Sequence, residues 1–229
     1  MKRLSEKAFN FSLRYALTEI FLITCGILIA FSIENWNENR KIEKIKLQTL
    51  HDISEGLQKD LEDIEVTMNG GYANRIKSYK IVLDVLNSKK VYADSLDRYF
   101  LALVGSSLLI SNTSPYETLK SRGLAIIDDT QLRNKVATYY DTRLEWLLEL
   151  EKDHLQHHVT FIRPKIYQYY IFSFDDKIIK SLDIEKMKKD EAYKGSLFLA
   201  SQNEKTIYDE YKVLKKYAEE IIEEVNKMN

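Results

Sequence analysis

The chain has few residues that break or cross-link the backbone. Its 229 residues include one cysteine, two prolines and seven glycines. The single cysteine, Cys25, excludes a disulfide framework within the chain. So few prolines and glycines supply too few turn signals for a many-stranded β fold, and they favour long helices. The composition therefore predicts an all-α protein.

An excess of charge of one sign is also missing. The chain has 34 basic and 35 acidic residues, a net charge of −1, and the two signs are interleaved along the sequence. A protein that binds nucleic acid usually presents a basic surface, because it has to neutralise backbone phosphates. The sequence thus predicts no nucleic-acid partner.

The common catalytic motifs are absent from the sequence. It contains no glycine-rich phosphate loop, no Gly-x-Ser-x-Gly elbow and no Cys-x-x-Cys pair. Adjacent acids such as Asp128-Asp129 fit helix caps and solvated faces better than an acid–base pair. We therefore expect a protein that is not an enzyme and carries no cofactor.

A long apolar run is present near the amino end. Leu13–Ile33 has 21 residues, which as a helix reach about 31 Å, the thickness of a bilayer's hydrocarbon core. Trp36 follows at the usual place of an interfacial aromatic. The sequence therefore predicts a short tail at 1–12, a transmembrane helix at 13–36 and a soluble helical bundle at 37–229.

The orientation of this span rests on its flanking charges. Four basic residues precede it and four follow it, namely Lys2, Arg3, Lys7 and Arg14 before and Arg40, Lys41, Lys44 and Lys46 after. Arg14 directly abuts the apolar run, and long soluble domains cross membranes largely regardless of charge. We expect a single-pass protein of the inner membrane with its bundle in the periplasm. Cleavage as a signal peptide fits less well, because the run is long and contains Glu19.

Glu19 lies about six residues inside the span, where an ionisable group is costly. It can face another helix of an assembly, or it can bond near the interface through Tyr15, one turn back. Both alternatives stay open. We take Glu19, Gly26 and Trp36 as the candidate membrane and assembly residues.

Two stretches of sequence resemble a known family. The first runs from Glu19 to Glu38 and contains Gly-Ile-Leu-Ile-Ala and Asn-Trp-Asn-Glu, and the second is Tyr116–Gly123. Further matches are Leu132-Arg133 and Tyr139-Tyr140. The pattern resembles that of uncharacterised single-span membrane proteins common in Bacteroidota, from which Thr18 and Phe31-Ser32 depart. The resemblance implies membrane placement and transfers no catalytic residue.

The soluble part carries two apolar stripes with helical steps of three and four residues. They are Leu50, Ile53, Leu57, Leu61, Ile64 and Met68, and Ile207, Tyr211, Leu214, Ala218, Ile221 and Val225. We expect the first stripe to pack in a core rather than form a coiled-coil stalk, and Asn69-Gly70-Gly71 to end or bend its helix. The last helix is expected from about Ser201, and the charged segment Asp183–Lys194 at the periphery.

Local signals place further helices between the stripes. Ser114 is expected as the N-cap of one helix, and Gly123 as the residue after its end. Asp128-Asp129 is expected to cap a helix that continues to Ile162. The aromatic segment Ile166–Phe174 fits a short strand, a helical turn or a loop.

One cluster has metal-ligand chemistry. His154, His157 and His158 are spaced i, i+3 and i+4, so on a helix their rings can share a face, with Glu151 just above them. Imidazoles at this spacing bind Zn²⁺ or Cu²⁺, although the Glu of the His-Glu-x-x-His motif is missing. The alternative is a solvated patch of histidines beside carboxylates.

These features predict a membrane-anchored structural or accessory subunit that acts through protein–protein interaction. Its expected partners are membrane lipid and either further copies of itself or other membrane subunits. A ligand-sensing bundle is the main alternative, although the 12 residues before the span are too few for an output domain. A metal-binding protein or hydrolase that uses the three histidines is the third.

Overall fold

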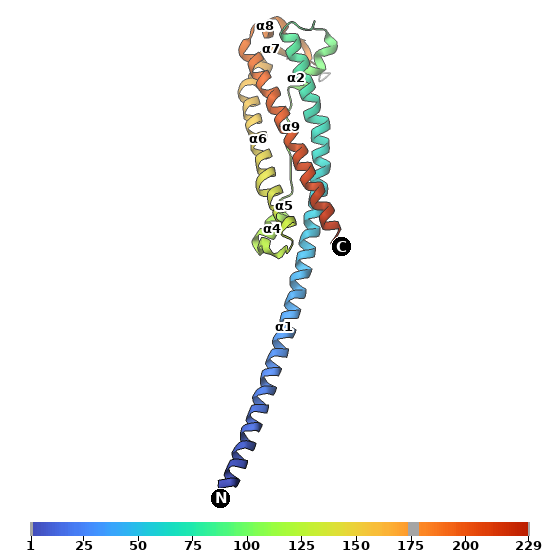
Figure 1. Ribbon diagram of the computed structural model, residues 1–229. Coiled ribbons are helices and arrows are strands. Elements are labelled where there is room, and N and C mark those ends of the chain that lie inside the picture. Colours follow the sequence, from blue (N-terminus) through green and yellow to red (C-terminus); the bar gives the residue numbers. More distant parts are fainter. Residues whose placement is uncertain (1, 174–178, 229) are drawn as a thin grey trace. The chain divides into compact units, whose positions relative to one another are not determined.

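The computed structural model describes residues 2–173 and 179–228 (Figure 1). The expectation of an all-α fold is confirmed, since the described residues form helices except for loops and one two-stranded sheet. The chain divides into two units, Met1–Thr49 and Leu50–Asn229. Each unit is considered by itself.

The first unit is helical throughout its described residues and belongs to helix α1, Lys2–Val66. Its large apolar side chains between Tyr15 and Trp36 are exposed. An 18-residue window of the helical run has a mean hydropathy of 2.2, and none of that window is buried. The first unit thus contains a helix long and apolar enough to cross a membrane once.

The second unit is a bundle in which several helices follow one another with little or no loop. The elements after α1 are η1 (Thr67–Tyr72), α2 (Ala73–Leu86), η2 (Asp94–Leu96), α3 (Asp97–Ala102), α4 (Ser114–Arg122), η3 (Leu124–Ile126), α5 (Thr130–Thr138), η4 (Tyr139–Leu144), α6 (Glu145–His157), η5 (His158–Ile162), α7 (Arg163–Tyr169), β1 (Tyr170–Phe172), β2 (Ile179–Leu182), α8 (Ile184–Lys189) and α9 (Glu191–Asn226). Of these, η1, η4 and η5 are π-helical turns, and η2 and η3 are 3₁₀ turns.

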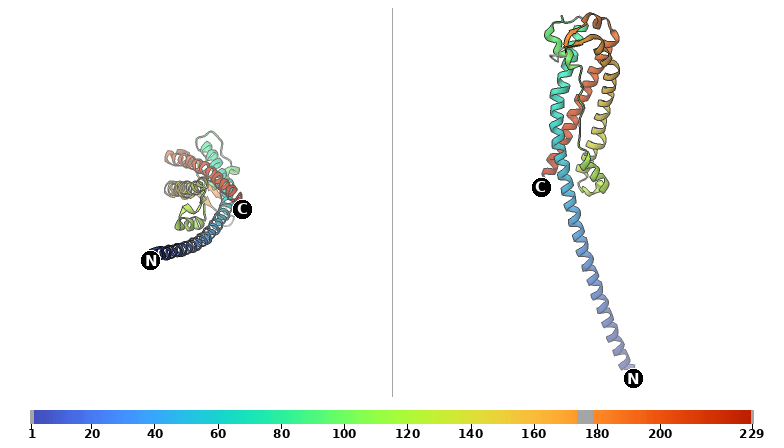
Figure 2. Two further views of the ribbon diagram at one scale, coloured as in Figure 1. Left: turned by 60° about the horizontal axis from the view of Figure 1, so that its bottom comes forward. Right: turned by 180° about the vertical axis from the view of Figure 1, so that it is seen from behind.

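The core forms where α9 packs along both α2 and α6 (Figures 1 and 2). One apolar cluster includes the predicted stripe that begins at Leu50, together with the stripe of the last helix. All six residues of the latter are buried, as predicted. The first stripe is buried except for the partly buried Leu61, so within this unit it packs in the core. The second cluster includes Tyr79, Phe100 and Leu197.

The structure excludes one of two open alternatives at Asn69-Gly70-Gly71, and it moves the start of the last helix. Gly70-Gly71 does not end the helix, because the backbone continues through a π turn in which Ala73 N–H donates to the carbonyl of Met68. The last helix begins at Glu191 rather than near Ser201, and the Asp190 side chain caps it by accepting from Tyr193 N–H. The segment expected at the periphery therefore contributes buried side chains, which are Ile184, Met187 and Tyr193.

The predicted caps are mostly correct. Asp129 accepts from the N–H groups of Gln131 and Leu132 at the start of α5. Gly123 follows α4 with a φ of 95°, a backbone conformation that favours glycine. Ser114 is the first residue of α4 rather than its cap, which is Thr113.

The helical run after Asp129 continues past the expected end at Ile162 into α7. The aromatic segment then forms the end of α7 and the strand β1, which pairs antiparallel with β2. Phe174, the last residue of that segment, lies outside the described residues.

Candidate functional site

The first unit presents the three candidate assembly residues on an exposed helix. Glu19, Gly26 and Trp36 are all exposed, and the Arg40 guanidinium carbon lies 5.1 Å from the centre of the Trp36 ring. No atom outside the local backbone lies within 4 Å of a Cβ built on Gly26. The exposed glycine thus leaves room for close approach by another helix.

The bundle contains a cluster of charged side chains in its core. Arg75, Glu151, His154 and Glu204 are each less than 9% exposed. They occupy core-facing positions that apolar residues fill elsewhere along α2, α6 and α9. Burying a charge is costly unless it is paired and hydrogen-bonded, so the partners of these four side chains define the site.

Arg75 and His154 converge on one carboxylate oxygen. Arg75 Nε donates to Glu204 Oε1 at 2.6 Å, and His154 Nε2 lies 3.0 Å from the same oxygen. Arg75 Nη1 also donates to Ser107 Oγ at 3.0 Å. The guanidinium carbon lies 4.6 Å from the centre of the Tyr72 ring, in cation–π geometry. α2, α6 and α9 are therefore linked by one ionic group.

Glu151 forms the second half of the cluster. Its Oε1 accepts from the hydroxyls of Tyr211 at 2.6 Å and Tyr72 at 3.0 Å, and its Oε2 accepts from Leu109 N–H at 3.0 Å. Burial raises the pKa of both tyrosines, and the negative charge of Glu151 raises them further. The hydroxyls hence stay protonated and keep donating to the carboxylate.

The three predicted metal ligands bind three different protein groups. His154 faces Glu204, whereas His157 Nε2 lies 3.0 Å from the Ser196 carbonyl and His158 Nε2 lies 2.9 Å from the Leu103 carbonyl. Burial lowers the pKa of His158. Among the described residues, no group of three or more His, Cys, Asp or Glu is arranged to hold a metal ion. The structure thus does not bring these rings together on one ion.

Several polar atoms of the cluster and of His158 have no hydrogen-bond partner among the described residues. They are Arg75 Nη2, Glu204 Oε2, His154 Nδ1 and His158 Nδ1. Most buried polar atoms in proteins are hydrogen-bonded, to protein or to ordered water. The unpaired atoms therefore give this cluster the capacity to bind water or a polar ligand. It also lies beside π turns, which recur at functional sites: η1 contains Tyr72, and η5 begins at His158.

The comparisons with known proteins give one match. The sequence profile of a family of unknown function, DUF6090, matches residues 19–177. The chain belongs to this family. No curated protein and no solved structure matches the chain.

The family's match spans most parts of both candidate sites. It includes Glu19, Gly26 and Trp36 in the first unit, and Arg75 and Glu151 in the bundle. It ends before α9, which supplies the partners Glu204 and Tyr211.

Two segments singled out for their resemblance to a family meet in the core. Tyr116 and Tyr140 stack with ring centres 4.4 Å apart and an interplanar angle of 8°, and Tyr139 meets Tyr140 edge-on. The Tyr116 hydroxyl donates to Asp141, and the Tyr139 hydroxyl donates to Asp60 at 3.4 Å. The tyrosines on which the family resemblance rests therefore pack in the core.

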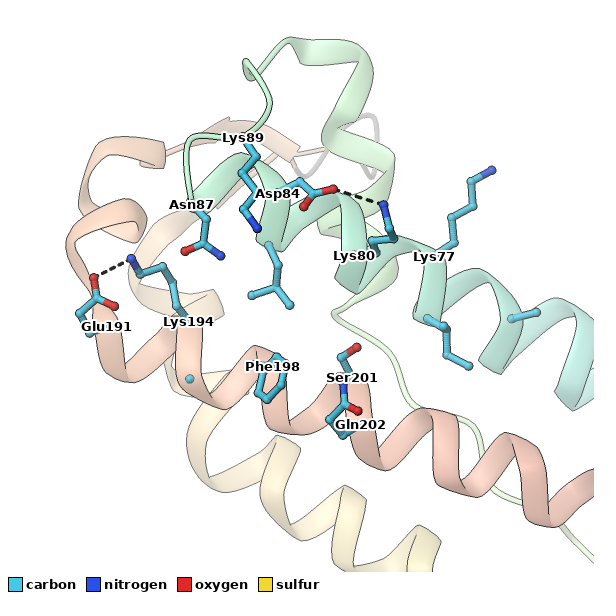
Figure 3. Close-up of a pocket in the computed structure, with 14 residues that line it drawn as sticks. Lys77, Lys80, Asp84, Asn87, Lys89, Glu191, Lys194, Phe198, Ser201 and Gln202 are labelled. Carbon is cyan, nitrogen blue, oxygen red and sulfur yellow. Dashed lines mark hydrogen bonds and ion pairs between the residues drawn. The ribbon is translucent and has the colours of Figure 1, made fainter.

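A groove of about 870 Å³ lies between α2 and α9 (Figure 3). Phe198, 59% exposed, lines it together with Ile76 and Leu83. Lysines surround this apolar surface, but Lys80 pairs with Asp84 at 3.4 Å and Lys194 with Glu191 at 2.6 Å. In Figure 3, Lys77 extends away from the other labelled side chains.

The sequence contains a signal for the buried charge cluster. The stripe of the last helix, extended backwards from Ile207 by three residues, reaches Glu204. In α2, Arg75 lies one helical turn before Tyr79, on the same side of the helix. A charged residue in register with an apolar stripe is a candidate for a buried, paired charge.

Proposed function

We propose that this protein is a membrane-anchored structural or accessory subunit that acts by binding other protein, either in a membrane complex or as a homo-oligomer. Its span lies in the inner membrane and its bundle lies in the periplasm. The observation that carries the proposal is the exposed apolar helix of the first unit. Apolar surface in water costs about 25 cal/mol per Å², which a bilayer removes.

The assembly part of the proposal rests on one face of that helix. At about 100° per residue, Gly26 and Ala30 fall within about 20° of the direction of Glu19. Gly26 and Ala30 form a small-xxx-small pair, which lets two helices approach closely in a membrane. Glu19 on the same face can then bond to the neighbouring helix rather than face lipid.

The experiment that tests assembly compares two glutamate-to-glutamine substitutions. Glu19→Gln removes the charge inside the apolar run, and Glu34→Gln makes the same change just beyond it. Each full-length variant is extracted from its own membrane in mild detergent and sized together with co-purifying protein. We expect Glu19→Gln to lose partners and Glu34→Gln to keep them. A monomer free of partners already in the unsubstituted protein contradicts the proposal.

The orientation of the protein in the membrane can be determined by labelling single engineered cysteines. In a Cys25→Ser background, Ser5→Cys marks the tail and Lys89→Cys marks the bundle. A membrane-impermeant thiol reagent added to cells with a permeabilised outer membrane should label Lys89→Cys only. Labelling of Ser5→Cys alone would place the bundle in the cytoplasm.

Ligand sensing by the bundle is a second candidate function. It draws support from the unpaired buried atoms near Arg75 and from the pocket that this residue lines.

A further inference from the structure

A pocket of about 380 Å³ opens beside the buried charge cluster. It lies between the end of α1, the π turn η1, the start of α2 and the segment after α3. Its lining residues are Val66, Thr67, Gly70, Gly71, Asn74, Arg75, Ala102, Gly105, Ser106 and Ser107. None of these is acidic, and the one charge among them is the guanidinium of Arg75.

Arg75 connects the pocket to the core. The residue is 6% exposed, so its stem and most of its guanidinium are held by the bundle. Nε is engaged by Glu204 and Nη1 by Ser107, which fixes the plane of the group, while Nη2 has no partner among the described residues. A fixed guanidinium with a free donor is prepared to bind an oxyanion.

The glycines around Arg75 keep the pocket open. A Cβ on Gly70 or on Gly105 would meet nothing within 4 Å, so each glycine leaves empty space where a side chain could stand. Gly71 differs, because its Cβ would come within 2.8 Å of Ser107 Oγ, the acceptor of the Arg75 bond. Glycine inside a helix costs about 1 kcal/mol relative to alanine. Packing against Ser107 thus requires glycine at position 71, whereas position 70, which lines the pocket, has room for a side chain.

A second pocket of about 250 Å³ adjoins the first. It is lined by Asn74, Lys77, Arg98 and Tyr99, and Asn74 lines both pockets. Lys77 makes no ion pair or hydrogen bond with any described residue. Among the described residues, Arg98 donates only to its neighbour Tyr99, and its guanidinium lies over that ring. The residues that line the two pockets include three cationic side chains and no carboxylate, and the acid paired with Arg75, Glu204, is not part of either lining.

We propose that the adjoining pockets bind a small organic molecule that carries two anionic groups. One oxyanion group is held by Arg75 and the hydroxyls of Ser106 and Ser107, and the second lies toward Lys77 and Arg98. The volumes suit a molecule of a few carbon atoms that carries two carboxylates, or one carboxylate and one phosphate. The groove between α2 and α9 is the weaker candidate, because its lining includes two acids, Asp84 and Glu191, which pair with Lys80 and Lys194.

The test measures binding to the intact protein in mild detergent. The probes are succinate, 3-phosphoglycerate and the uncharged analogue succinamide, each titrated by calorimetry up to about 10 mM and checked by the shift in melting temperature. We expect succinate, 3-phosphoglycerate or both to bind and succinamide not to bind. Preference for 3-phosphoglycerate over succinate identifies the phosphate class, and the reverse identifies the dicarboxylate class. Failure of both anionic probes to bind, or equal binding of succinamide, overturns the proposal.

A matched pair of variants locates the binding. Gly70→Leu fills the first pocket, and Gly195→Leu makes the same change at a helical glycine that also has open space around it but lines the α2–α9 groove. We expect Gly70→Leu to abolish binding of the anionic probes while the protein still melts cooperatively, and Gly195→Leu to bind normally. Equal binding by both variants would place the ligand elsewhere and refute the site.

Substitutions of exposed charged residues provide a second test of the binding site, because they leave the core unchanged. Lys77→Gln and Arg98→Gln alter exposed side chains and are expected to leave folding intact. Each should weaken binding of the anionic probes about tenfold, the typical loss of one charge-assisted contact. Lys77 also lines the α2–α9 groove, so Arg98→Gln is the variant that separates the two sites. Lys89→Gln alters an exposed lysine that lines the groove but neither of the adjoining pockets, and this control should bind as the unsubstituted protein does. An effect of Lys89→Gln equal to that of Arg98→Gln would indicate binding to general surface charge and contradict the proposal.

Discussion

Arg75 and Glu204 are 129 positions apart in sequence, yet Arg75 Nε donates to Glu204 Oε1 at 2.6 Å. Their side chains are 7% and 1% exposed, so the ion pair is almost completely removed from water. This pair joins α2 to α9 at the point where His154 of α6 meets the same oxygen.

The first prediction concerns the stability that depends on this pair. Arg75→Leu leaves a buried carboxylate without its cation, and we expect it to lower the free energy of unfolding by about 3–5 kcal/mol. Glu204→Leu should cost a similar amount because it strands the guanidinium. The double variant should be more stable than either single one, since both charges are gone. Urea unfolding of all three checks this, and strictly additive losses would show that the two residues are not coupled.

A second prediction concerns the tyrosine donors to Glu151. Tyr72→Phe and Tyr211→Phe each remove one hydroxyl that donates to a buried carboxylate, so each should cost about 1–3 kcal/mol. Tyr140→Phe is the matched control, because the Tyr140 hydroxyl is buried without a partner among the described residues. It should change the free energy of unfolding by less than about 0.5 kcal/mol. Equal losses at the three positions would argue against a special role of Glu151.

The third prediction concerns pH and Asp60. Asp60 is buried, and this burial raises its pKa above the ordinary value of 3.8, although Ser111, Asn112 and Tyr139 donate to its carboxylate. A group whose pKa is raised by folding stabilises the fold while it is protonated in both states. That stabilisation is lost as the pH rises from about 4 through the raised pKa.

The comparison with Asp60→Asn isolates this effect. The difference in unfolding free energy between the unsubstituted protein and Asp60→Asn should shift in favour of the variant as the pH rises from about 4. Above the folded pKa it should level off. Thermal melts across this range check the sign, and a shift in favour of the unsubstituted protein would contradict the assignment.

The apolar pattern was a good guide to the core. The stripe from Ile207 to Val225 is buried as predicted, because helical periodicity depends only on neighbouring residues. The start of that helix was placed ten residues late, since Gly195 and the charges around it weaken the pattern before Ser201. Asp190 could have been recognised as its cap.

The candidate sites were harder to predict for a physical reason. A charged residue is normally expected at a solvated position, so the sequence alone does not single out Arg75 or Glu204. Their ion pair forms only through tertiary contact between residues 129 positions apart. The three histidines lie on helical backbone, His154 and His157 in α6 and His158 in η5, as the sequence predicts. It could not show that α9 and the segment near Leu103 supply a separate partner to each ring.

We expect the protein to assemble through one face of its apolar helix. A photo-cross-linking amino acid, p-benzoylphenylalanine, is placed at Ile23 or at Leu28 of the full-length protein, and native membranes are irradiated. Ile23 lies about 40° from Glu19 around the helix, and Leu28 lies about 180° away. We predict a defined protein adduct from position 23 and only lipid adducts from position 28. Equal protein adducts from both positions, or none from position 23, would show that the protein does not assemble through the face that contains Glu19.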